Sequence, residues 1–250
     1  MVSVEDLTFS YGEKIVLRDV NFDHDEGILG ILGPNGSGKT TLLKLMNALL
    51  KPQSGDVKID GESVFSMKRK DLSKRITLVS QELRIVFDYR VIDVVLMGSI
   101  SRKIFPDEDE IERARDLLKE MGISHLSDRR LGSLSGGERR IVLLSKAIFQ
   151  GCDLIAVDEL ELHLDPKHKV EIASLMRDLS RKGKIVIAVF HDINLALSVS
   201  DRIIGLKDGK ILFDTDPRDD SVPRLLEDLY QTRFESFRFK KRWVLVPSML

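Results

Sequence analysis

The sequence contains a single cysteine and no long apolar segment. Because Cys152 stands alone, no disulfide can form within the chain and no cysteine cluster can hold a metal ion, which suits a reducing compartment. No apolar run approaches the ~20 residues that a membrane span requires. The first residues, MVSVEDLTFS, lack the basic stretch and apolar core of a signal peptide. We therefore expect a cytoplasmic protein that does not itself cross a membrane.

The sequence also lacks an excess of charge of either sign. Its 39 basic and 40 acidic residues leave a formal net charge of −1. No overall field attracts nucleic acid, so we expect no nucleic-acid partner. The short basic runs KRK at 68–70 and FKKR at 239–242 are typical of solvated surface.

Apolar patterns of two kinds alternate along the chain. Short apolar or β-branched segments predict strands, and apolar residues at helical spacing predict helices. The predicted strands lie at 2–9, 28–33, 75–80, 154–158 and 184–190, and the predicted helices include 41–50, 111–121 and 172–179. RIIGLKDGKILFD at 202–214 predicts a hairpin that turns at Asp208 and Gly209. This alternation indicates an α/β fold, a mainly parallel sheet covered by helices.

The mostly helical middle of the chain divides this fold. We expect one domain over residues 1–250, with no internal repeat or low-complexity linker. Approximately residues 1–85 and 151–215 form its core. Approximately residues 86–150 form an inserted helical subdomain, and approximately residues 216–250 form a C-terminal extension.

A complete phosphate-binding motif follows the strand at 28–33. GPNGSGKT matches G-x-x-x-x-G-K-[ST] between a strand and a helix, a context that disfavours an ordinary glycine-rich turn. Its backbone N–H groups and the helix N-terminus can bind phosphate, Lys39 can reach the β- and γ-phosphates, and Thr40 can bind Mg²⁺. The expected nucleotide-binding residues are Gly33, Pro34, Asn35, Gly36, Ser37, Gly38, Lys39, Thr40 and Thr41.

Two adjacent carboxylates follow the apolar segment LIAV at 154–157. A phosphate-loop protein needs a second acidic strand end to hold Mg²⁺, and Asp158 is the candidate. Glu159 then stands where a general base can polarise a water. Neighbouring strand residues point to opposite faces, but the end of a strand can turn both carboxylates toward one site. The alternative is a pair of solvated charges.

LSGGE at 134–138 is a second helix start that contains glycines. Ser135 and Glu138 have the spacing of a capping box. A cap does not require Gly136 and Gly137, and two glycines at a capped helix start make a second anion site. One nucleotide cannot easily occupy both sites within one small chain. A head-to-tail homodimer resolves this, because each nucleotide then lies between the phosphate loop of one copy and the LSGGE of the other.

Together these motifs resemble those of the ATP-binding subunits of ABC transporters, over nearly the whole chain. GPNGSGKTT is similar to the family's Walker A motif, LSGGE to its signature motif and LIAVDE to its Walker B motif. The resemblance implies a P-loop NTPase core with an N-terminal antiparallel β region and an inserted helical subdomain. It also implies an ATPase that uses ATP and Mg²⁺.

The resemblance assigns further roles by position. Tyr11 matches the aromatic residue that stacks on adenine, and Asp165 matches the aspartate of the D-loop. Gln81 matches the glutamine that contacts Mg²⁺ and senses the membrane partner. His191 matches the switch histidine that contacts the γ-phosphate, and it would act in catalysis with Glu159 and the phosphate-loop lysine. Taken alone, Tyr11 also fits an ordinary strand end and His191 a structural histidine.

The chain departs from the family pattern beside Glu159. Leu160 and Glu161 stand where the family usually has Pro and then Ser or Thr, and Leu162 stands where a small polar residue is usual. Every phosphate, Mg²⁺ and water contact remains available, so we expect the departures to affect crosstalk between the two sites of a dimer and to slow turnover. We interpret His163 and His168 as solvated or structural, because their spacing favours a metal site only weakly.

Three segments resemble the subgroup that serves importers of iron chelates (siderophores), haem and cobalamin. They are residues 191–214, 91–98 and 225–235. The resemblance implies a homodimer, a transmembrane permease and, indirectly, an extracytoplasmic binding protein. It also implies a peripheral location on the inner face of the cell membrane.

The segment at 81–90 is expected to receive the permease. Its Ile85, Val86 and Phe87 could form an apolar socket. Three other classes of protein remain open. They are a zinc or manganese importer ATPase, a soluble ABC ATPase such as one for cluster assembly, and a regulatory module that binds ATP with weak hydrolysis.

Overall fold

The structure is a computed structural model that describes residues 1–80, 87–100 and 105–248. The chain begins in an antiparallel sheet with the strand order β2–β1–β4–β5. These strands are β1 (Val2–Tyr11), β2 (Lys14–His24), β4 (Ser54–Ile59) and β5 (Glu62–Ser63). Val2, Val4, Leu7 and Phe9 of β1 are all buried. The N-terminal antiparallel region that the family resemblance implies is therefore confirmed.

The main sheet has the strand order β10–β9–β3–β8–β7–β6. These strands are β3 (Ile28–Leu32), β6 (Ile76–Val79), β7 (Leu154–Asp158), β8 (Ile185–Val189), β9 (Arg202–Lys207) and β10 (Lys210–Thr215). All neighbours pair in parallel except β9 and β10. Every residue of β3, β7 and β8 is buried, as expected for parallel strands covered on both faces.

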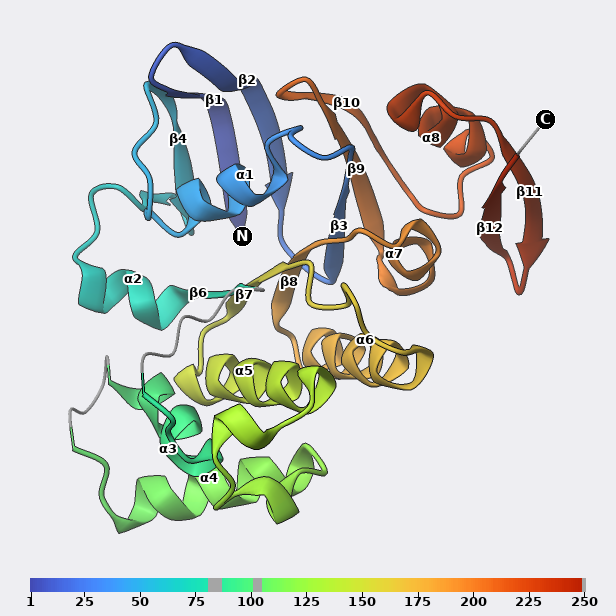
Figure 1. The fold of residues 1–250 in the computed structure, drawn as a ribbon. Coiled ribbons are helices and arrows are strands. Elements are labelled where there is room, and N and C mark those ends of the chain that lie inside the picture. The colour runs from blue at the N-terminus through green and yellow to red at the C-terminus, as the bar shows by residue number, and fades with distance from the viewer. Residues whose placement is uncertain (81–86, 101–104, 249–250) are drawn as a thin grey trace.

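Helices cover both faces of the main sheet (Figure 1). Helix α1 lies between this sheet and the N-terminal sheet and shares one apolar core with both, whereas α5 to α8 pack on the opposite face. The bounds are α1 (Lys39–Met46), α2 (Arg69–Arg75), α5 (Gly136–Gln150), α6 (Pro166–Arg181), α7 (Ile193–Val199) and α8 (Val222–Tyr230).

A helical insertion separates β6 from β7 and has its own apolar core, which includes Val91, Leu118 and Leu126. Its further elements are α3 (Val91–Leu96), η1 (Met97–Ser99), α4 (Glu108–Glu120), η2 (Ser124–Leu126) and η3 (Leu131–Ser133). In Figure 1, α3 and α4 lie on the far side of α5 from the main sheet. The inserted helical part of the expected fold is thus confirmed.

The C-terminal part returns to the main sheet through α8 and ends in a hairpin of β11 (Phe234–Phe239) and β12 (Arg242–Pro247). Val222, Leu226 and Leu229 of α8 are buried in the core of the main sheet. In the described part of the chain, no helix has both the length and the apolar character needed to span a membrane.

Candidate nucleotide site

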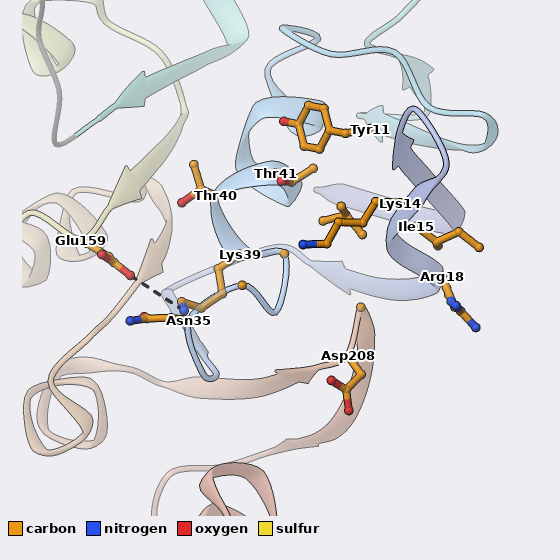
Figure 2. A pocket seen from close by; sticks show the side chains of 14 residues that line it. Tyr11, Lys14, Ile15, Arg18, Asn35, Lys39, Thr40, Thr41, Glu159 and Asp208 are labelled. Atoms are coloured by element: carbon orange, nitrogen blue, oxygen red, sulfur yellow. Dashed lines mark ion pairs between the residues drawn. The ribbon is translucent and has the colours of Figure 1, made fainter.

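The phosphate loop joins β3 to α1 and borders a pocket of about 670 Å³. That volume lies within the range of small-molecule sites. Figure 2 shows Lys39 pointing toward Glu159, while Tyr11 lies beyond Thr41 as seen from Lys39. The pocket is therefore lined by Glu159, by Tyr11 and by most of the predicted phosphate-loop residues, which are Asn35, Gly36, Gly38, Lys39, Thr40 and Thr41. Gly33, Pro34 and Ser37 do not line it.

The loop requires glycine at two places. A Cβ atom on Gly33 would lie 2.1 Å from the carbonyl oxygen of Leu206, and one on Gly38 would lie 2.6 Å from the Leu17 side chain. Gly38 also has a φ of 107° and forms no side-chain cap on α1. The first N–H groups of α1 are consequently left without a capping side chain, which suits an anion ligand.

Lys39 is buried at the start of α1 and is held by backbone carbonyls. Its Nζ atom donates to the oxygen of Gly33 at 2.8 Å and to that of Pro34 at 3.2 Å. It also lies 3.9 Å from Oε1 of Glu159. Burial lowers the pKa of Lys39, and the charges of Glu159 and Asp158 oppose that shift. The ammonium is therefore already aimed across the loop toward the Walker B carboxylates.

The end of β7 turns its two carboxylates toward different residues of α1. Asp158 is the last residue of β7, and its Oδ1 atom accepts a hydrogen bond from the Thr40 hydroxyl at 3.1 Å. Glu159 has a φ of 46°, which bends the chain and directs its carboxylate toward Lys39. Both carboxylates therefore face the phosphate loop, although neighbouring residues within a strand would point apart.

The pair of Thr40 and Asp158 fits the metal that the family implies. Hydroxyl and carboxylate oxygens are the hard donors that Mg²⁺ prefers. Burial raises the pKa of Asp158, the Thr40 hydrogen bond lowers it, and the charge of Glu159 raises it further. A neighbouring cation would favour the charged form of this carboxylate. In the described residues, no group of three or more His, Cys, Asp or Glu side chains gathers as an additional metal site.

The pocket contains residues that the motifs did not reveal. Lys14 and Arg18 of β2 and the turn at Asp208 and Gly209 line it. Lys14 could have been found, because it pairs with Tyr11 across the β1–β2 hairpin. Arg18 and the turn could not, because Arg18 N–H donates to the oxygen of Gly209, far along the chain, at 2.8 Å.

His191 lies away from the pocket around Lys39. Its side chain is exposed and does not line the pocket around Lys39. Its backbone N–H donates to Oε1 of Glu161 at 2.6 Å, and the N–H of Asp192 donates to the same oxygen at 3.3 Å. The turn at His191 and Asp192, which we call the switch turn, is thus held by its backbone N–H groups to the segment after β7.

The LSGGE segment begins α5. Ser135 and Glu138 form the predicted capping box, with Ser135 N–H donating to Glu138 at 2.8 Å. A Cβ atom on Gly137 would lie 2.3 Å from the His168 ring, whose Nδ1 is 2.7 Å from Oδ2 of Asp165. Ser135, Gly136, Gly137, Glu138 and Asp165 do not line the pocket around Lys39. Within one copy, the two anion-binding candidates are therefore separate.

Part of the expected permease segment lies outside the described residues. Gln81, Ile85 and Val86 belong to that part. Phe87 is described, and its side chain is 66% exposed. Its ring meets that of Tyr89 edge to face, at 6.0 Å between centroids. An exposed phenylalanine in contact with a half-buried tyrosine therefore lies in the described part of this segment.

Comparisons with known proteins agree with this geometry. Residues 17–161 match the family model described as ABC transporter. The petrobactin import ATP-binding protein of Bacillus subtilis (strain 168) is 34% identical over 92% of each chain. The zinc transport system ATP-binding protein of Treponema pallidum (strain Nichols) is 37% identical, over 81% of this chain and 77% of its own. A phosphonates import ATP-binding protein of Nitratidesulfovibrio vulgaris is 37% identical, over 86% of this chain and 83% of its own.

Solved structures extend the similarity to the C-terminal part. A metal-chelate type ABC transporter in an inward-facing conformation superimposes with a TM-score of 0.84 at 28% identity, over 99% of this chain and 97% of its own. A dimeric ATP-binding cassette bound to ADP and Pi gives a TM-score of 0.77 at 30% identity, over 86% of this chain and 98% of its own. The chain belongs to the ABC transporter family. Within it, the chain is an ATP-binding subunit and an ATPase.

Proposed function

We propose that the chain powers an ABC importer of an iron chelate (siderophore), haem or cobalamin by hydrolysing ATP with Mg²⁺. The observation that carries the ATPase part is the pair of contacts that the end of β7 and the residue after it make with α1: Asp158 pairs with Thr40 at 3.1 Å, and Glu159 lies 3.9 Å from Lys39. The transport part is supported by the relatives, which are named as import proteins for petrobactin and iron(3+)-hydroxamate.

The site residues divide the chemistry among them. Lys39 and the loop N–H groups bind the β- and γ-phosphates, and Tyr11 stacks on the adenine. Thr40, Asp158 and Gln81 hold Mg²⁺, which supplies positive charge at the transferred phosphoryl group. Glu159 orients and polarises the attacking water.

The switch histidine and the second copy complete this site. His191 contacts the γ-phosphate, which requires its exposed side chain to turn toward the nucleotide. Ser135, Gly136, Gly137 and Glu138 of one copy bind the nucleotide held by the other copy, with Asp165 beside them. The separation of these residues from the pocket around Lys39 supports a head-to-tail homodimer.

The importer assignment adds a permease, an indirect extracytoplasmic binding protein and a peripheral location on the inner face of the membrane. Support for the iron-chelate class comes from the metal-chelate type transporter, whose similarity covers 99% of this chain and so includes the C-terminal part. A zinc or manganese importer is the second candidate, because the Treponema zinc protein is 37% identical.

Two conservative variants test the ATPase assignment. Glu159→Gln keeps the shape of the side chain and removes its charge. It should bind ATP with Mg²⁺ normally, hydrolyse it at least ~100-fold more slowly, in line with general-base contributions, and accumulate as an ATP-bound dimer in size-exclusion chromatography. Asp158→Asn should also lose Mg²⁺-dependent binding. Phosphate release by Glu159→Gln at the parent rate would contradict the assignment.

A transport assay tests the substrate class. Cells that lack the chain should lose uptake of one labelled substrate among an iron chelate, haem, cobalamin, zinc and manganese. Complementation by the parent chain but not by Glu159→Gln should restore that uptake. Loss of zinc or manganese uptake alone would favour the second candidate.

A further inference from the structure

The C-terminal part of the chain touches the nucleotide site at the first residue of the phosphate loop. Tyr230 ends α8, and its phenol oxygen accepts a hydrogen bond from the N–H of Gly33 at 3.2 Å. The two residues are 197 positions apart. None of the nucleotide-binding motifs includes Tyr230, so their chemistry does not account for this contact.

Gly33 is held from both sides. Its N–H is bound by Tyr230, and its carbonyl oxygen accepts from Nζ of Lys39 at 2.8 Å. It also packs so closely on β9 that a Cβ atom would lie 2.1 Å from the oxygen of Leu206. Loss of the hydrogen bond between Gly33 N–H and Tyr230 would therefore loosen Gly33, and with it the carbonyl oxygen that positions the Lys39 ammonium.

The Tyr230 phenol is itself firmly positioned. The buried Leu226 and Leu229 anchor α8 in the core of the main sheet. Burial raises the pKa of Tyr230 to about 12, the Gly33 hydrogen bond opposes this, and the charge of Glu159 adds to it. The phenol is therefore neutral at physiological pH and can accept the N–H without bringing a second negative charge near Glu159.

A second contact joins the C-terminal hairpin to the helix after the switch turn. The side chain of Asn194 donates to the oxygen of Leu245 at 3.0 Å and accepts from its N–H at 2.9 Å. Asn194 lies in the first turn of α7, three residues after His191. The C-terminal part therefore contacts both the phosphate loop and the helix that carries the switch turn.

We propose that Tyr230 is a positioning residue for the nucleotide, which acts by holding Gly33, and that residues 216–248 brace the phosphate loop against α7. This inference rests on the proposed nucleotide site. It gives the C-terminal part a role in ATP binding by its own subunit, in addition to packing on the core.

The test compares Tyr230→Phe with a matched variant in the same part of the chain. Tyr230→Phe removes one oxygen and leaves Gly33 N–H without its acceptor. From the usual net value of one hydrogen bond, ATP affinity should fall about three- to tenfold. The KM for ATP should rise by a similar factor while kcat changes less than twofold. Calorimetry on the full-length protein and a phosphate-release assay measure both.

Trp243→Phe is the matched variant. It removes the hydrogen bond from Nε1 to the oxygen of Asp219, 2.7 Å long, without touching the phosphate loop. ATP affinity should then stay at the parent value. Equal weakening by both variants would mean that the segment acts only through stability and would overturn the proposal. Parent-like affinity of Tyr230→Phe would overturn it too.

Hydrogen exchange gives an independent readout in the intact protein. The amide of Gly33 should exchange faster in Tyr230→Phe than in the parent chain, and unchanged exchange would contradict the contact. Failure of the proposed nucleotide site is separable, because Lys39→Ala would then retain ATP affinity whatever Tyr230→Phe does.

Discussion

The carboxylate of Glu161 accepts a hydrogen bond from the backbone N–H of His191 at 2.6 Å. Glu161 is only 3% exposed, and burial raises the pKa of its carboxyl group against the lowering effect of its backbone hydrogen bonds. Arg140 of α5 donates to the carbonyl oxygens of Leu160 and Leu162 on either side. The positions that depart from the family pattern thus join the end of β7, the switch turn and α5.

Glu161→Ala should damage this junction. It leaves the N–H groups of His191 and Asp192 without their acceptor, so the free energy of unfolding should fall by about 1–3 kcal/mol. Because the phosphate loop is untouched, ATP affinity should change little. The kcat should fall about tenfold, since a tenfold change in rate corresponds to about 1.4 kcal/mol, which is within the expected loss. Urea denaturation, calorimetry and phosphate release measure the three quantities.

Glu161→Gln is the control for this variant. It keeps an acceptor oxygen at the same distance from the backbone and should retain most of the stability and turnover. If Glu161→Ala turns over ATP as fast as the parent chain, the junction does not serve hydrolysis.

Ser135→Ala should have two separable effects. Loss of the cap on α5 should lower stability by about 1 kcal/mol, and loss of the hydroxyl at the proposed second anion site should lower ATP turnover. Asp107 caps α4 by accepting from the N–H of Glu110 at 3.0 Å. Asp107→Ala should therefore cost similar stability at unchanged turnover. Equal turnover in both variants would argue that Ser135 is a cap alone.

Lys39→Ala should remove most ATP affinity and all hydrolysis while the fold survives, because the ammonium is the point charge aimed at the β- and γ-phosphates. Lys14→Ala also removes a cation from this pocket. Unlike the Lys39 ammonium, the Lys14 ammonium is not positioned by carbonyl groups of the phosphate loop. Its effect on affinity should be smaller, about threefold, as for an exposed charge pair. Titration calorimetry ranks the two, and the reverse order would mean that the phosphates bind beside β2.

The stability of the protein should depend on Tyr230 at alkaline pH. The pKa of a phenol is about 10 when unfolded and about 12 for Tyr230 in the folded chain. The folded state therefore keeps this proton longer. Its stabilising effect is complete below pH ~10 and is lost as the pH rises toward ~12. The difference in urea midpoint between the parent chain and Tyr230→Phe should shrink over this range, whereas a constant difference would mean an ordinary pKa.

Phe87→Asp should uncouple transport and leave basal ATP hydrolysis nearly unchanged. An exposed aromatic at this position suits an apolar contact with the permease, and a carboxylate would oppose it. Phe237→Asp, at a side chain that is also exposed on β11, should leave transport intact. Uptake assays with both variants distinguish permease docking from a general effect of an added charge.

Local patterns predicted much of the fold. The buried strands β3, β7 and β8 follow from apolar runs, and the β9–β10 hairpin turns at Asp208 and Gly209, both with positive φ, as the Asp-Gly pair indicates. The capping box of Ser135 and Glu138 also follows from spacing alone. In each case the residues that determine the local structure lie within a few positions of one another, so their pattern can be recognised in the sequence.

The remaining contacts could not be predicted, because they join a side chain to a distant backbone group. Tyr230 binds the N–H of Gly33, and Glu161 binds that of His191. A backbone N–H is present at every residue except proline, so it leaves no mark in the sequence. The phosphate-loop motif likewise located Lys39 without indicating that Arg18 shares its pocket.

The close packing of Gly137 on the His168 ring links the signature segment to the start of α6. Even an alanine at 137 would require the ring to move, and the ring is tied to Asp165 by a 2.7 Å hydrogen bond. A larger residue at 137 should therefore be accepted only with a smaller one at 168. In related chains the residues at 137 and 168 are therefore expected to change as a pair, which links the signature segment to the first turn of α6.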